Sequence, residues 1–183
     1  MDAKPDSVRE RLESRPAVYW RDYALALGRI AVGGYWLYEQ HWKLPPDFGL
    51  HQPRGLMFAF QQSIQYPTLG LYKDFLQEVV VPHFQLFGWL VFTGEVAIGT
   101  SLTLGLFTKA GALLGTMQAL NLLVAEGRTP EGPRIYLAIL AANLFVLAAP
   151  SNRQLSLDRL LAPKLDQAAS RGSGLARALR WLM

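Results

Sequence analysis

Four apolar stretches that are almost free of charge restrict most strongly how this chain can fold. They run from Tyr23 to Tyr38, Phe84 to Phe107, Ala110 to Ala125 and Ile135 to Ala149. A helix that is apolar on all sides must be hidden from water, in a large core or in a bilayer. A chain of 183 residues lacks the amphipathic helices that would cover four of them. The pattern therefore predicts an all-α membrane protein, a four transmembrane helix bundle over residues 23–149.

Three of these stretches are short for a bilayer, since a helix needs about 20 residues to cross roughly 30 Å of hydrocarbon. Each must extend its span with interfacial residues at its ends. Trp20, Trp42 and Arg134 are placed to do this.

The basic residues are distributed unequally between the two sides that such a bundle would have. Twelve flank the side carrying both chain ends, and five flank the other side. The twelve are Lys4, Arg9, Arg11, Arg15, Arg21, Lys109, Arg153, Arg159, Lys164, Arg171, Arg177 and Arg180, and the five are Lys43, Arg54, Lys73, Arg128 and Arg134. The positive-inside rule then predicts a multi-pass protein of the plasma (inner) membrane with cytoplasmic termini. Its basic ends are expected to bind membrane lipid, not nucleic acid.

The segments outside the helices also have recognisable patterns. Residues 1–22 are expected to form a cytoplasmic surface helix. Residues 39–83 predict an amphipathic extracytoplasmic loop between helices 1 and 2, with short helices at Arg54–Gln65 and Leu71–Val81. The alternative is one helix from Val79 to Phe107 that bends at Pro82.

The basic tail, residues 150–183, is expected to break after Pro150 and again at Pro163. Near its end, leucines fall on one helical face and arginines on another, which predicts a helix lying on the inner leaflet. The alternative is an ordinary solvated tail. The leucines are Leu175, Leu179 and Leu182, and the arginines are Arg177 and Arg180.

Two ionisable residues, Arg29 and Glu95, lie within the predicted spans, where each is costly unless paired or facing a cavity. At about 1.5 Å per residue they lie roughly 11 Å and 17 Å from the inner end, a gap that an arginine side chain can cross. We therefore expect them to interact. The pair could be purely structural, or it could form the polar wall of a ligand or proton site.

All three histidines, His41, His51 and His83, fall in the predicted outer portion among tyrosines and tryptophans. Histidine can ligate a metal or haem, or hydrogen-bond a quinone oxygen. No His-x3-His spacing supports a metal, so an interfacial belt is the favoured interpretation. The absence of cysteine excludes disulfides, thiolate metal sites and iron–sulfur ligation. The sequence therefore predicts no metal and no haem.

Two motifs carry a family resemblance. The run LGRIAVGGYW at residues 27–36, followed by Trp42 and Lys43, resembles the first helix of DoxX/DoxD membrane proteins. GEVAIG at 94–99 and LTLGLFTK at 102–109 are similar to the family's second helix and its exit. The resemblance implies a four-helix membrane fold and makes Arg29, Lys43 and Glu95 counterparts of family polar positions. The long outer loop is more similar to the DoxD branch, whose members are described as subunits of thiosulfate:quinone oxidoreductase.

Three functions follow as hypotheses. The first is the membrane subunit of a quinone-linked redox complex that needs a second protein subunit, so its own role as an enzyme stays open. The others are a structural or assembly scaffold and a small-molecule transporter, which would have to form a homo-oligomer. A quinone needs an apolar slot with a few polar groups. The candidates are Arg29, His41, Lys43, His83 and Glu95, with Trp36 and Trp42 as stacking surfaces.

Overall fold

The computed structural model describes residues 15–130, 132–149 and 154–183, and these form helices and turns without a strand. The all-helical prediction is confirmed. The predicted surface helix at residues 1–22 lies mostly outside the described residues, and the first described helix, α2, begins at Arg15. The elements are α2 (Arg15–Tyr38), η1 (Glu39–Trp42), α3 (Leu56–Gln65), α4 (Gly70–Phe75), η2 (Leu76–Val80), α5 (Phe84–Leu104), α6 (Thr108–Glu126), α7 (Gly132–Ala148), α8 (Asp158–Ser170) and α9 (Gly174–Trp181).

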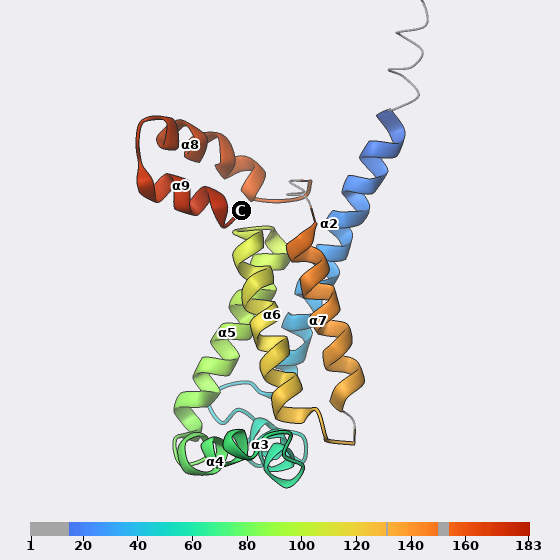
Figure 1. Ribbon diagram of the computed structural model, residues 1–183, viewed down its shortest axis with the longest axis vertical. Coiled ribbons are helices and arrows are strands. Elements are labelled where there is room, and N and C mark those ends of the chain that lie inside the picture. Colours follow the sequence, from blue (N-terminus) through green and yellow to red (C-terminus); the bar gives the residue numbers. More distant parts are fainter. Residues whose placement is uncertain (1–14, 131, 150–153) are drawn as a thin grey trace, which may run out of the picture.

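The four long helices, α2, α5, α6 and α7, run side by side along the long axis of the molecule (Figure 1). Each contacts two others, so that α2 packs on α5 and α7, while α6 packs on α5 and α7. The four apolar stretches of the sequence lie within these four helices. By length and hydropathy, only α5 among the described residues qualifies as a membrane-spanning helix, and α7 is apolar but shorter.

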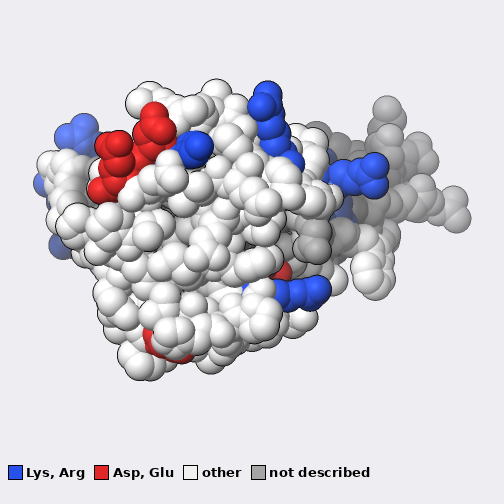
Figure 2. Space-filling model, turned by 90° about the horizontal axis from the view of Figure 1, so that it is seen from below, with Lys and Arg blue, Asp and Glu red and all other residues white. Residues whose placement is uncertain are grey.

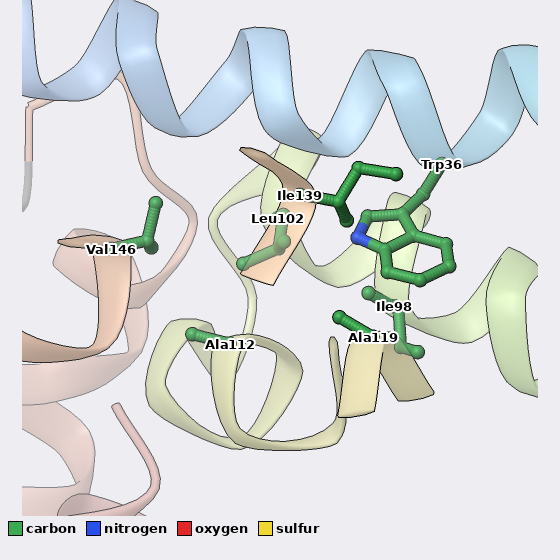
Figure 3. Close-up of a cluster of buried hydrophobic side chains, with 7 residues drawn as sticks. All are labelled: Trp36, Ile98, Leu102, Ala112, Ala119, Ile139 and Val146. Carbon is green, nitrogen blue, oxygen red and sulfur yellow. The ribbon is translucent and has the colours of Figure 1, made fainter. Parts of the chain in front are cut away.

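The core between these helices combines one large aromatic ring with small and branched side chains. Trp36 of α2 lies against Ile98 and Ile139, and Ala112 and Ala119 fill the side belonging to α6 (Figure 3). Small residues let helix backbones approach closely, which is how helices associate when lipid surrounds them. One such close approach is between α2 and α5.

The close contact of α2 with α5 requires a glycine at position 33. A Cβ built at Gly33 would lie 2.5 Å from the backbone nitrogen of Thr103 and 2.8 Å from the carbonyl oxygen of Gly99. The next residue, Gly34, has open space around it. Only one glycine of this pair therefore serves the helix contact.

A layer of short helices closes one end of the bundle. α3, α4 and the π-helical turn η2 lie there crosswise, below α5 and α6 in Figure 1. A second hydrophobic cluster packs this layer against the start of α5. It is formed by Phe48, Leu56 and Phe84. The chain turns at residues 81–83, the position of the bend expected at Pro82, and a new helix runs from Phe84 to Leu104, so Val79 and Phe107 both lie outside α5.

Helices α8 and α9 form a hairpin at the opposite end of the bundle (Figure 1). The predicted break at Pro163 is wrong, because α8 continues through that residue. Pro163 is exposed, so water can satisfy the Arg159 carbonyl that loses its helical donor. Asp158 and Ala162 are buried and hold the first turns of the helix in place. The predicted break after Pro150 lies outside the described residues.

Candidate functional site

A pocket opens between the layer of short helices formed by α3, α4 and η2, called the outer layer below, and the ends of the long helices. Every long helix contributes to it, together with η1, α3 and α4. Its walls are aromatic and aliphatic, and polar groups project into it from several helices. Its charged residues are Glu39, Lys43, Glu95 and Glu126, and its aromatic residues are Tyr35, Trp36, Trp42, Phe60, Tyr72 and Tyr136.

A buried ion pair forms the polar wall of this pocket. The Lys43 ammonium contacts Glu95 Oε2, and both side chains are almost fully buried. Gln40 Nε2 donates to Oε2 of Glu95 at 2.6 Å, and Gln118 Nε2 donates to Oε1 at 3.2 Å. The carboxylate is thus held by three donors from two segments, the η1 turn and α6, which offsets the cost of burying its charge.

The short turn η1 explains why Lys43 reaches Glu95. The chain continues from α2 into this 3-10 turn, and the Lys43 backbone nitrogen closes it by donating to the Gln40 carbonyl. The Lys43 ammonium also lies 4.4 Å from the centre of the Trp42 ring, a cation–π distance. One turn therefore places both Lys43 and Gln40 on the Glu95 carboxylate.

The expected Arg29–Glu95 pair is wrong. Arg29 is buried but donates to the backbone carbonyl of Leu102 and, at 2.8 Å, to that of Leu155. The last carbonyls of a helix lack intrahelical donors and carry partial negative charge, so the end of α5 attracts a cation. Arg29 therefore belongs to the opposite end of the bundle and takes no part in the pocket.

A second set of polar side chains faces the pocket from η1, α4, α6 and α7, and apart from Trp42 its members were not among the candidates from the sequence. The Tyr136 hydroxyl donates to Glu126 at 2.8 Å, and the Trp42 indole donates to Glu39 at 3.3 Å. The Tyr72 hydroxyl donates to Asn121 at 3.0 Å, and burial raises the pKa of this phenol. Each acid directly follows an apolar run, which is the pattern that could have identified it.

The remaining predicted residues separate into two groups. Trp36 and Trp42 line the pocket, and the Trp36 indole donates to Asn143 Oδ1 at 3.4 Å. His41 and His83 are exposed and do not line it, since their Nδ1 atoms lie 2.7 Å and 2.9 Å from the carbonyls of Tyr38 and Val79. Within the described part of the chain, no group of three His, Cys, Asp or Glu residues could hold a metal ion.

The sequence of the chain also matches a known family. The chain matches the family described as "TQO small subunit DoxD" over residues 23–177. No curated protein and no solved structure that was compared matches the chain. The family match covers most of the sequence and confirms the resemblance seen in the two motifs. The chain belongs to the DoxD family.

Proposed function

We propose that this chain is the membrane subunit of a thiosulfate:quinone oxidoreductase-like complex and binds the quinone in the pocket beneath its outer layer. In this proposal α2, α5, α6 and α7 all cross the plasma membrane, and the α8–α9 end lies in the cytoplasm. The family description supports the assignment, because it names the small subunit of such an oxidoreductase. The buried Lys43–Glu95 pair beside aromatic walls is the observation that carries it.

The outward-facing side chains support membrane crossing by all four helices. The helix exteriors expose Leu27, Leu37, Leu86, Trp89, Leu90, Leu113, Leu114, Met117, Leu120, Leu137, Leu144 and Phe145. Between Tyr23 and Tyr38 the one charged residue, Arg29, is buried, and Glu95 is buried in α5. Lipid contacts only these outer faces, so charge on the inside does not prevent insertion.

Helix α6 illustrates why the mean hydropathy of a helix underestimates how apolar its outward face is. Its small and polar residues Gly111, Gly115 and Thr116 are buried against neighbouring helices, whereas Leu113 and Met117 are exposed. The inward residues lower the average over the helix without touching lipid. The face that lipid would meet is therefore more apolar than the helix as a whole.

The end view agrees with this arrangement. Seen from the outer-layer end, the few charged side chains are separated by a wide uncharged surface (Figure 2). A largely uncharged end with scattered charges suits the headgroup region and a partner that approaches it. A quinone could enter the pocket from the adjoining lipid.

The pocket has the composition that a quinone ring needs, because ligand pockets are mainly apolar with a few placed polar groups. Lys43 and Gln118 offer N–H donors for a quinone carbonyl, and Trp36 and Trp42 offer flat surfaces for the ring. Reduction of a quinone to a quinol takes up two electrons and two protons.

The two electrons have to come from a partner, since the chain has no cysteine that could carry them. In the proposed complex this partner oxidises a small reductant such as thiosulfate at the outer face. Two carboxyl groups line the pocket, Glu95 and Glu126, and these are the candidates for passing the two protons to the quinone. The isolated chain therefore binds quinone but is inactive until the partner is added.

Binding of a short-chain quinone to the purified full chain in lipid nanodiscs tests the proposal. We expect saturable quenching of tryptophan fluorescence, weakened at least tenfold by Glu95→Gln. Glu78→Gln makes the same chemical change at an exposed position outside the pocket and should leave binding intact. If the quinone quenches the unchanged chain, Glu95→Gln and Glu78→Gln equally and weakly, the proposal is contradicted.

One observation favours a scaffold role as the second candidate. Lys43, Gln40 and Gln118 all contact the Glu95 carboxylate, so this carboxylate has its partners without a ligand. In that case Glu95→Gln would lower stability, and no variant would affect quinone. Co-purification of a partner subunit without quinone-dependent activity would support this role.

A further inference from the structure

The exposed side of α9 is unusual for a helix next to water. Leu175, Ala178 and Trp181 follow each other at three-residue intervals, so they share one face, and all three are exposed. Leu175 and Trp181 are 72% and 66% exposed. The opposite face packs inward through Ala176 and Met183, which are buried. The helix therefore presents large apolar side chains that no described residue covers.

Positive charge surrounds this apolar face. Arg171 in the turn before α9 and Arg177 within it are both exposed. The acids of the hairpin do not neutralise them, because Asp158 is buried and Asp166 pairs with Arg180 at 2.7 Å. An apolar stripe bordered by free arginines matches a surface of anionic lipid headgroups.

Hydrogen bonds also fix the hairpin to the end of the bundle. The Leu157 and Asp158 nitrogens donate to the carbonyls of Leu104 and Gly105, and the Ala110 nitrogen donates to the Leu182 carbonyl. Both ends of the hairpin are thus tied to the turn between α5 and α6. It projects sideways from the bundle, with α9 on the side nearer the long helices and α8 outermost (Figure 1).

We propose that α9 lies in the headgroup region of the leaflet at the α5–α6 turn, with Leu175 and Trp181 inserted between anionic lipids. Arg171 and Arg177 contact the lipid phosphates, and α8 covers α9 from the aqueous side. The proposal requires the bundle to be embedded in a bilayer but does not depend on quinone binding. It also differs from a generally basic tail, because α9 alone inserts.

A single cysteine carrying a nitroxide label tests this directly, since the chain has no cysteine of its own. Leu175→Cys places the label on the apolar face of α9, and Gln167→Cys places it at an exposed position of α8. Both substitutions are at exposed sites, so the fold tolerates them. The full chain is reconstituted in nanodiscs of phosphatidylcholine with or without phosphatidylglycerol, and collision of the label with oxygen and with a water-soluble nickel chelate is measured.

In the anionic nanodiscs we expect the label at residue 175 to meet oxygen more readily than the chelate, and the label at 167 to show the reverse. Removing phosphatidylglycerol, or the double change Arg171→Gln and Arg177→Gln, should make residue 175 more accessible to the chelate. The matched charge change at the other end, Arg54→Gln with Lys73→Gln, should have no effect.

Two results would overturn the proposal. One is a residue 175 label that is as open to the chelate as the label at 167 in every lipid. The other is spectral broadening at residue 175 that disappears when labelled protein is diluted with unlabelled protein, because a second copy would then cover the face.

Discussion

Glu95 and Lys43 show how a single turn decides the partner of a buried charge. Arg29 is the nearer cation in the helical pattern, yet it binds the carbonyls at the end of α5. Lys43 lies outside the apolar stretches and is brought to Glu95 by η1. A buried ion pair is weak evidence of stability in itself, but losing one partner leaves an uncompensated charge.

The Lys43–Glu95 pair predicts strong coupling in a double-mutant cycle. Glu95→Gln or Lys43→Gln alone should lower the free energy of unfolding by about 3–5 kcal/mol, and the double change should cost less than the sum. Chemical unfolding in detergent provides the measurement. The exposed Arg180–Asp166 pair is the control, for which coupling below about 1 kcal/mol is expected. Strictly additive effects of Lys43 and Glu95 would disprove the contact.

At the scale of residues, the sequence predicts which side chains line the pocket better than it predicts which of them contact one another. Lys43, Glu95, Trp36 and Trp42 were named as candidates, and all four line the pocket. Their arrangement could not be predicted, since helical periodicity gives depth and face but not the path of an irregular turn. The candidates did not include Glu126, which directly follows the apolar stretch from Ala110 to Ala125.

At the scale of elements, the contact of α2 with α5 depends on Gly33. Gly33→Ala should destabilise the protein by about 1–3 kcal/mol, the usual cost of overpacking, because its methyl group would meet the α5 backbone. Gly34→Ala has open space and a better helix former, so it should be neutral or stabilising by up to about 1 kcal/mol. Thermal unfolding of the two variants in the same detergent compares them. Equal effects would show that the helices do not approach at Gly33.

Asp158 connects the hairpin to the start of α6. Its carboxylate accepts from the Phe107 nitrogen at 2.8 Å and from the Thr108 nitrogen and hydroxyl at 3.1 Å and 2.9 Å. Asp158→Ala removes a helix cap and should cost about 1–2 kcal/mol. Proteolysis should then cleave the hairpin faster. Asp166→Ala, which removes an exposed acid of the same helix, should cost about 1 kcal/mol or less. The opposite order of stability would refute the capping role.

Regular elements were the easiest part to foresee. Apolar runs located the four long helices, and the amphipathic pattern placed short helices near α3 and α4. Pro163 misled the prediction, because docking of Asp158 and Ala162 outweighs its helix-breaking tendency. Such docking depends on residues 50 or more positions apart, which no local pattern contains.

For the whole molecule, the basic asymmetry makes a prediction about sidedness. A single cysteine at Gln167 should react with a membrane-impermeant maleimide only from the cytoplasm, and one at Glu78 only from outside. Labelling of intact cells and of inverted vesicles measures this, and both positions are exposed. Reaction of Gln167→Cys in intact cells would reverse the topology.

The hydrogen bonds that tie Arg29 and the α8–α9 hairpin to the α5–α6 turn also bear on the order in which the chain folds during synthesis. In the proposed membrane arrangement, the ribosome makes Arg29, the end of α5 and the start of α6 before it makes their partners Leu155, Asp158 and Leu182. Until those partners follow, donors and acceptors at that end of the bundle stay unmatched, and unmatched backbone groups are costly in a bilayer. A chain that stops before Asp158 should therefore be less stable than the full chain.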